Sequence, residues 1–441
     1  MGEKLSFESI VWAIGSVFDA QQDNRKQEQC SYRLSDAGLG AFSVFYTQSP
    51  SFLAHQRDMQ RRKGMSNAQK LFDMVKIPTD THIKALLDPV DEGCLGYVFR
   101  HVVGELQQAG KLKDYEVMAG HYLLALDGTD YFSSQKIHCR NCSSRVLKGG
   151  KRHYRHSVIP PVLVAPEKNE VISLEPEFIK AQAGEVKQDC EVKAAKRWLK
   201  DKAGHYPLDK VVVLADDLYC HQPLCEAVLA KNWHFILVCK PESHQTLYDY
   251  LSLQVPESLS KTRWNGRFHE VWTYRYANRL PLREGDDALL VNWCELSVHR
   301  KDTGEQLYKN SFATDVELSE VNVPDIVRYG RSRWKTENEN NNVLKTKGYN
   351  LEHNYGHGQA NLSAVLLSLI LLAFLTHTVL ALSDRKYRAI RSELGSRKTF
   401  FDDIRALLRY KLFDSWAQLL DFMIQGLDIK LDSIDIKLDS S

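Results

Sequence analysis

Two short apolar runs, each ending on an aspartate, decide the fold: HYLLALDGTDYF at residues 121–132 and KVVVLADDLY at residues 210–219. Both runs are too short for a helix and typical of strands buried on both faces. Asp127 and Asp216 follow the runs directly. Ligand sites of open α/β sheets lie at the carboxyl ends of strands, so both carboxylates are candidates for one site. Aspartate also ends strands because it favours turns, and either residue alone is therefore weak evidence.

Strands and helices alternate around these runs. The pattern predicts a hairpin over 157–179 with its turn at 167–169, a helix over 190–204, a helix over 222–232 and a strand over 233–240. This order predicts an α/β fold, a mixed sheet with helices on its faces. A capping box at Ser66 and Gln69 predicts a helix beginning there.

The composition changes along the chain and predicts several domains. The first part has helical patterns, residues 263–311 are rich in aromatic and β-branched residues, and helical patterns return after residue 323. We expect a helical N-terminal domain (1–115), a first part of the core (116–255), a β-rich insertion (256–318), the C-terminal part of the core (319–385) and a helical C-terminal region with a tail (386–441). Residues 428–441 repeat one heptapeptide, DIKLDSI then DIKLDSS, and we expect a weakly ordered tail.

Charge and apolar segments limit the function classes. The 441 residues carry a formal net charge of +2, so nucleic-acid binding would depend on local basic patches. The start of the chain contains Glu3, Glu8 and Asp19, which a secretory signal would not tolerate, and we expect a cytoplasmic protein. The segment 362–382 is long enough to span a bilayer, but His377 and the lack of a second such segment favour a buried core helix. Nine cysteines, an odd number, argue against a disulfide framework.

A third candidate acid lies in RYGRSRWKTENENNNVLK, residues 328–345. Glu337 and Glu339 are about 200° apart on a helix, so only one of them can face a shared site, and we expect Glu339 on the solvated face. Arg333 lies one turn before Glu337 and can pair with it.

Three segments in this order, ALDGT, VVVLADDLY and RSRWKTENEN, resemble the DDE transposases of bacterial insertion sequences. The similarity covers residues 123–377 and is greatest to the branch with a Tyr-Arg-Glu-Lys signature and a β-rich insertion. Tyr329 lies one residue farther from Arg333, and Lys345 one residue farther from Glu337, than that signature expects. These departures weaken the assignments of Tyr329 and Lys345 more than that of Glu337.

The resemblance implies an RNase H-like core in which Asp127, Asp216 and Glu337 bind two divalent ions, Mg²⁺ or Mn²⁺. The implied activity is cleavage at transposon ends and strand transfer into target DNA. The resemblance also implies an N-terminal domain that binds DNA, a catalytic core and a homodimer. No membrane partner is expected. Asp216 fits the pattern better than Asp217, and Asp130 is interpreted as a solvated turn residue. The alternatives are a catalytically inactive or domesticated DNA-binding relative, against which the intact acids argue, and a membrane-associated protein.

Basic residues near these motifs are candidate phosphate contacts. No acidic residue offsets the seven Lys and Arg residues between Gln135 and Pro166. The candidates for DNA binding are Lys151, Arg152, Arg155, Arg331, Arg333, Lys335 and Lys345.

The basic segment 136–156 also contains the residue types of a zinc site. Cys139 and Cys142 form a C-x₂-C pair, and His153 with His156 follows a basic loop. His138 is a rival for His153. Free thiols in a loop with DNA-facing histidines are the alternative, because C-x₂-C pairs also serve redox roles.

Overall fold

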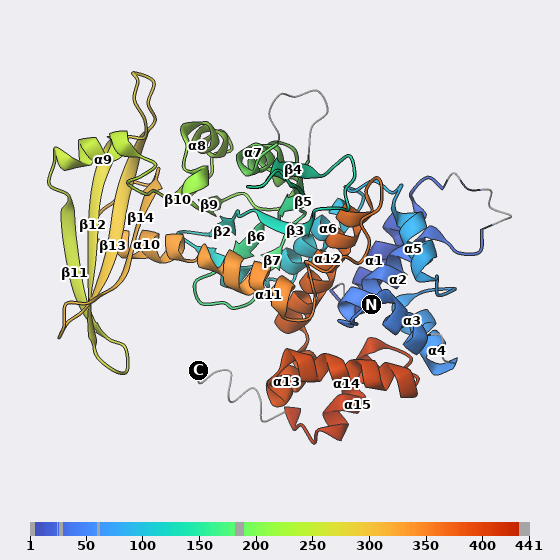
Figure 1. Cartoon of the computed structure of the whole chain (residues 1–441). Coiled ribbons are helices and arrows are strands. Elements are labelled where there is room, and N and C mark those ends of the chain that lie inside the picture. Colours follow the sequence, from blue (N-terminus) through green and yellow to red (C-terminus); the bar gives the residue numbers. More distant parts are fainter. Residues whose placement is uncertain (1–4, 24, 26–29, 60–61, 181–188, 432–441) are drawn as a thin grey trace.

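The computed structural model describes residues 5–23, 25, 30–59, 62–180 and 189–431. Most of the repeated heptapeptide lies outside these residues. A mixed sheet forms the centre of the molecule (Figure 1). In spatial order its strands are β7 (Ile172–Ser173), β6 (Val162–Val164), β2 (His121–Ala125), β9 (Val211–Ala215) and β10 (His234–Val238).

The strand directions follow from the connections. β2, β6 and β7 form an antiparallel meander, with β1 (Glu116–Val117) on its edge beside β2. β9 is parallel to β2, and β10 is parallel to β9, because helices α7 (Glu191–Asp201) and α8 (Gln222–Leu229) make the crossovers. Every residue of β9 is buried, as its unbroken apolar sequence predicts. The expectation of a mixed α/β sheet with helices on its faces is confirmed.

The β-rich segment extends this same sheet. β14 (Gln306–Thr314) pairs antiparallel with β10, and the order continues through β13 (Leu290–Arg300), β12 (His269–Pro281) and β11 (Glu257–Trp264). Helices α9 (Gln245–Ser252) and α10 (Val323–Arg331) lie beside these strands (Figure 1). The segment thus shares backbone hydrogen bonds with the central strands.

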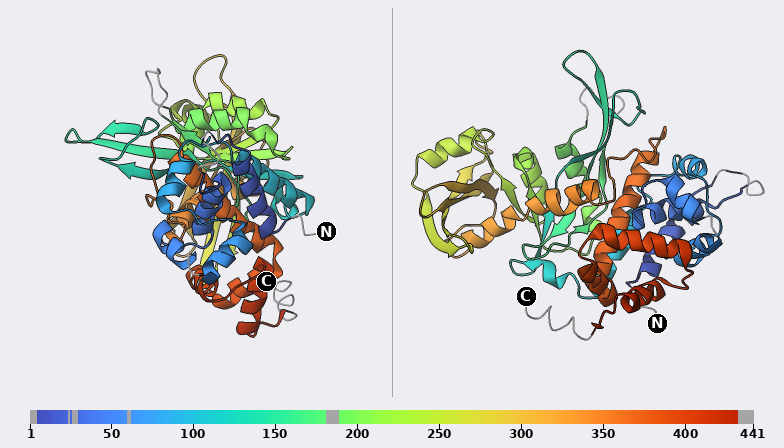
Figure 2. Two further views of the ribbon diagram at one scale, coloured as in Figure 1. Left: turned by 90° about the vertical axis from the view of Figure 1, so that its right-hand side faces the viewer. Right: turned by 60° about the horizontal axis from the view of Figure 1, so that its bottom comes forward.

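A second sheet carries the basic segment. Its strands are β3 (Thr129–Ser134), β5 (Arg152–Ile159), β4 (Ser143–Val146) and β8 (Glu177–Ile179). Pro160 and Pro161 lie where the chain passes from β5 in this sheet to β6 in the central sheet; proline cannot donate to a strand ladder. The ends of β4 and β5 project from the body as a basic arm, residues 143–155 (Figure 2).

Helix α12 (Leu362–Ser383) lies between the central sheet and the N-terminal helices and packs against α2 and β7 (Figure 1). It is apolar and long enough for a membrane span by length and composition, and 89% of its most apolar window is buried inside the protein. The expectation of a buried core helix agrees with this burial. The N-terminal helices are α1 (Phe7–Asp19), α2 (Leu34–Tyr46), α3 (Phe52–Met59), α4 (Arg62–Phe72), α5 (Asp80–Leu87) and α6 (Gly96–Gln108).

Helices α13 (Arg385–Leu394), α14 (Arg397–Tyr410) and α15 (Trp416–Gly426) follow α12. α14 contacts α4, and the Asn67 side chain of α4 donates to the carbonyls of Leu408 and Lys411. The predicted capping box at Ser66 was wrong, because α4 begins at Arg62 and Ser66 lies inside it.

Candidate active site

Asp127 and Asp216 lie at the same end of two adjacent parallel strands. Ala125 of β2 is opposite Leu214 of β9, and the Leu126 amide donates to the Leu214 carbonyl at 2.8 Å. Continuing this register by two residues sets Asp127 opposite Asp216. The sheet therefore brings together the two aspartates that the sequence analysis selected.

Asp127 is half-buried and shares its surroundings with other acids. Burial raises the pKa of Asp127 to about 7; Arg333 opposes this shift, and the charges of Asp216, Glu337 and Glu191 add to it. Asn341 donates from Nδ2 to Asp127 Oδ2 at 3.3 Å. Several carboxylates thus lie close together, and the positive charge beside them does not balance their negative charge. A divalent cation would reduce the repulsion between them.

Glu337 reaches this group from a helix of unusual geometry. The sequence predicts a regular helix, but residues Thr336–Asn341 form a π-helical stretch, η5, followed by α11 (Asn342–Thr346). Arg333 Nη1 lies 2.7 Å from Glu337 Oε1, an ion pair rather than an aligned hydrogen bond. The wider turn sets both Glu337 and Asn341 toward Asp127; such stretches are frequent at functional sites.

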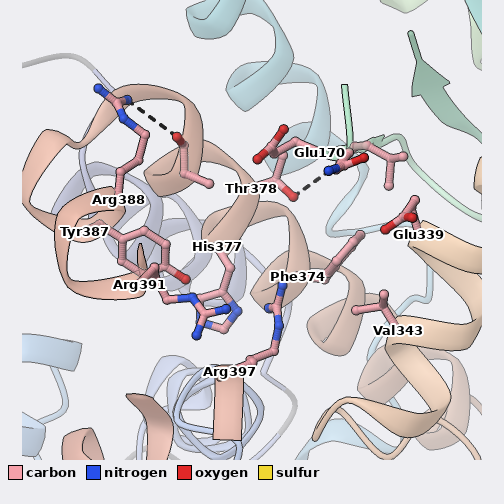
Figure 3. Close-up of a pocket in the computed structure, with 13 residues that line it drawn as sticks. Glu170, Glu339, Val343, Phe374, His377, Thr378, Tyr387, Arg388, Arg391 and Arg397 are labelled. Atoms are coloured by element: carbon pink, nitrogen blue, oxygen red, sulfur yellow. Dashed lines mark hydrogen bonds between the residues drawn. The ribbon is translucent and has the colours of Figure 1, made fainter. Parts of the chain in front are cut away.

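Glu339 belongs to another part of the molecule. It lines a cavity of about 300 Å³ together with His377, Arg391 and Arg397 (Figure 3). This cavity lies beside α12 and the helices that follow it, and none of the three candidate acids lines it. The expectation that the two glutamates face different surroundings agrees with this arrangement, but Glu339 is half-buried in a cavity and not on a solvated face.

Glu191, the first residue of α7, is a fourth acid of the group, and the sequence analysis missed it. Burial raises the pKa of its carboxyl group, with the charge of Asp216 adding to the shift. Tyr219 donates its hydroxyl to Glu191 Oε2 at 3.1 Å. A Cβ at Gly128 would lie 2.3 Å from Glu191 Cδ, so any larger residue at this position would displace the carboxylate. The sequence signal is poor, because acids are common in the first turn of any helix.

The two rival acids have other partners. Asp217 lies in the short helix η4 (Asp217–Tyr219), where its Oδ1 accepts from the Lys240 amide at 2.7 Å and lies 3.3 Å from His244 Nε2. Asp130 is a residue of strand β3 and not of a turn; it accepts a hydrogen bond from the Ser157 hydroxyl and lies 3.7 Å from Arg155. Asp216 itself accepts from the Leu218 amide at 3.0 Å.

A polar cleft of about 620 Å³ adjoins the acids. Gly128 and Glu191 form part of its wall, and Arg155 and Lys345 also line it. Lys345 pairs with Glu352 at 2.9 Å. The cleft offers positive groups to a phosphate-containing ligand, and of the acid group it is Glu191 that lines it.

The candidate DNA-contacting residues divide into exposed and internal groups. Lys151 and Arg152 are exposed on the basic arm. Lys335 is only 3% exposed and donates to the Lys168 carbonyl at 2.7 Å, so its ammonium group is held inside the protein. Arg331 lies over the rings of Trp272 and Tyr308, where it joins α10 to the extended sheet. The position of Lys335 does not fit a phosphate contact, whereas the assignment of the half-buried Arg331 stays a prediction.

A second group of side chains, of types that could hold a metal ion, lies at the root of the basic arm. Cys139, Cys142, His156 and His357 place their donor atoms within 4.8 Å of one another. His357 takes the place that the sequence analysis gave to His153, which lines the polar cleft, while the ring of the other rival, His138, stacks on Tyr154. His357 lies in a distant segment between α11 and α12, so local spacing could not reveal it.

Comparisons with known proteins find similarity in structure but not in sequence. No protein-family profile matches the sequence, and no curated protein matches it. The fold is similar to the cryo-EM structure of a piggyBac transposase synaptic complex with hairpin DNA, with a TM-score of 0.41 and 13% sequence identity. The similarity covers 96% of this chain and 80% of that chain.

Proposed function

We propose that this chain is a DDE-type DNA transposase that cleaves DNA at transposon ends and transfers the strands into target DNA. The observation that carries the proposal is the convergence of Asp127, Asp216 and Glu337, from two strand ends and a distant helix, beside a polar cleft. The meander β2–β6–β7 followed by the parallel strands β9 and β10 is the arrangement we assign to an RNase H-like core.

The donor set fits hard divalent cations. Carboxylate oxygens are the ligands that Mg²⁺ and Mn²⁺ prefer. Burial raises the pKa of Asp127, and the charges of Asp216, Glu337 and Glu191 add to the shift, so a cation beside this carboxylate would be stabilising. Asp127, Asp216 and Glu337 would hold the ions, with Glu191 close by. Bound divalent ions supply activation of the attacking hydroxyl and stabilisation of the leaving oxygen in phosphoryl transfer.

The remaining side chains position these ligands. Asn341 holds one oxygen of Asp127 through its amide, and Arg333 fixes the Glu337 carboxylate. Tyr219 orients Glu191. Because these partners come from packed strands and helices, the carboxylates lose little freedom when ions and DNA bind.

DNA would follow the positive groups outside the acid cluster. Lys151 and Arg152 are exposed on the basic arm, and Arg155 lies at its base in the polar cleft. The N-terminal helices and the extended sheet are the parts available for recognising the ends. We further propose a homodimer, since two ends must be cut within one complex.

The test is a cleavage and strand-transfer assay on the purified full chain, with DNA carrying the sequences that flank its gene. We expect nicked or joined products with Mg²⁺ or Mn²⁺ and none with EDTA. Asp127→Asn should abolish them. Asp209→Asn should not, because Asp209 is an exposed acid at the opposite end of β9. Metal-independent products, or unchanged products with Asp127→Asn, would contradict the proposal. DNA binding without cleavage would indicate the inactive relative.

A further inference from the structure

The donor atoms at the root of the basic arm have tetrahedral spacing. Cys139 Sγ and Cys142 Sγ are 3.9 Å apart, and the Nε2 atoms of His156 and His357 are 3.1 Å apart. The distances from His156 Nε2 to the two sulfurs and from His357 Nε2 to Cys142 Sγ are 3.3–3.5 Å. Zn–S and Zn–N bonds of ordinary length place tetrahedral ligands about 3.8 Å (S–S), 3.6 Å (S–N) and 3.4 Å (N–N) apart. All the observed distances lie within a few tenths of an ångström of these values.

Neighbouring hydrogen bonds prepare these atoms for a metal. The Cys139 amide donates to Cys142 Sγ at 3.4 Å. His357 Nδ1 lies 3.0 Å from the Gly358 carbonyl, which can only accept, so Nδ1 carries the proton. In the neutral ring the Nε2 lone pair is then directed at the cluster. Metal-bound histidines characteristically have this second hydrogen bond.

Burial excludes water as the partner of these groups. Cys142, His156 and His357 are all at least 92% buried. The ring of Phe132 lies 4.4 Å from that of His357, and Tyr131 stacks on His156 at 5.6 Å. Two imidazole nitrogens facing each other in a dry site are costly unless they share a cation.

We propose that Cys139, Cys142, His156 and His357 bind one structural Zn²⁺ ion. Two thiolates and two neutral imidazoles form a closed, tetrahedral donor set, which is typical of structural rather than catalytic zinc. The proposal stands on this geometry alone and does not depend on the proposed DNA chemistry.

The ion would join three parts of the molecule. The two cysteines precede β4 of the basic arm, His156 lies in β5, and His357 lies in the segment between α11 and α12. This segment is held elsewhere as well: Asn141 donates to the Ala360 carbonyl at 2.8 Å, and Asp88 accepts from the amides of residues 359, 360 and 362. Zinc would therefore fix the direction of the arm relative to the helices that carry Glu337.

A second cluster of described residues is weaker. Cys220, Cys239 and His244 offer three donors, and His244 Nε2 already lies 3.3 Å from the Asp217 carboxylate. The total zinc content alone would not distinguish the two clusters, so the zinc content of variants in the first cluster must be compared with that of the wild type.

The test is metal analysis of the full chain purified without chelator. We expect about one zinc per chain in the wild type and its loss in His357→Ala. His153→Ala is the matched control and should retain the zinc, because His153 lines the cleft instead. Cobalt substitution should give thiolate charge-transfer and tetrahedral d–d absorption in the wild type and in His153→Ala, and neither in His357→Ala.

Folding is checked on the wild type, so that an unfolded variant cannot decide the result. Zinc removed by a chelator should return on dialysis against ZnCl₂ with recovery of the circular dichroism spectrum. A wild type that stays zinc-free in ZnCl₂ would overturn the proposal, as would equal zinc loss in His153→Ala. A Cys139–Cys142 disulfide in zinc-free protein, found by mass spectrometry, would overturn it in favour of a redox pair.

Discussion

The acid cluster and the Cys/His cluster are built from different kinds of sequence information. Asp127 and Asp216 become neighbours because each directly follows a strand, and adjacent parallel strands end on one edge of the sheet. Cys139, Cys142 and His156 lie close together in sequence, but His357 joins them only through the packing of α12. Regular secondary structure thus allows distant ligands to be predicted, whereas ligands on irregular segments depend on tertiary packing.

The two clusters also differ in their charge balance. The Cys/His cluster can become neutral by binding one Zn²⁺ ion, since two thiolates match its charge. The acid cluster has four carboxylates, Asp127 included, and the arginine that acts on Asp127 is Arg333. It therefore stores repulsion in the metal-free protein, and we expect it to respond to pH and to divalent ions more strongly.

The largest expected effect concerns Glu337. Glu337→Gln should reduce DNA cleavage by on the order of 10³-fold, because a ligand that stabilises charge in the transition state is lost. Glu339→Gln is the matched control on the same helix and should change the rate little, because Glu339 lines the other cavity. Single-turnover cleavage rates measure both. Equal losses in the two variants would show that the helix, and not one carboxylate, matters.

The next effect concerns the glycine beside Glu191. Gly128→Ala should move the Glu191 carboxylate, because the added Cβ would overlap it. We expect a loss of about 1 kcal/mol in the free energy of unfolding and a roughly ten- to hundredfold slower cleavage from the displaced group. Gly204→Ala is the control, since a Cβ there meets nothing within 4 Å. Denaturant unfolding and cleavage rates provide the measurements, and wild-type behaviour of Gly128→Ala would remove Glu191 from the site.

The pH dependence of stability separates the two clusters. The pKa of Asp127 is raised to about 7 in the folded protein from 3.8, so the folded state binds the proton more tightly. The contribution of Asp127 to the free energy of unfolding is greatest below pH 4 and is lost as the pH rises through 7. Within that window the loss is roughly 1.4 kcal/mol per pH unit. We expect Mg²⁺ to restore stability at pH 8 and Asp127→Asn to flatten the profile. Thermal unfolding at a series of pH values tests this, and an unchanged profile in Asp127→Asn would contradict it.

The smallest effect concerns the basic arm rooted at the Cys/His cluster. Lys151→Ala and Arg152→Ala should each lower the salt dependence of DNA binding by about one unit of slope. Neither change should alter the free energy of unfolding, because both side chains are exposed. Filter binding over a series of salt concentrations measures the slope. Wild-type slopes in both variants would show that the arm does not contact DNA.

Much of the central sheet could be predicted from sequence because its signals are local. The unbroken apolar runs that became β2 and β9 require burial on both faces, and the acids after them follow from the same pattern. The π-helical turn at Thr336–Asn341 could not be predicted, since it depends on packing around Asp127. Glu191 carries no distinguishing pattern. The error at Ser66 arose because a capping motif can occur inside a helix whose start is fixed by contacts elsewhere.

The comparison of Asp216 with Asp217 tests the central claim most directly. The two acids are neighbours in sequence, but Asp216 lies with the acid cluster, whereas Asp217 accepts from the Lys240 amide. Single-turnover DNA cleavage with Mn²⁺, normalised to the folded fraction, should be abolished in Asp216→Asn and retained in Asp217→Asn. Cleavage retained in Asp216→Asn, or lost only in Asp217→Asn, would contradict the assignment of the site.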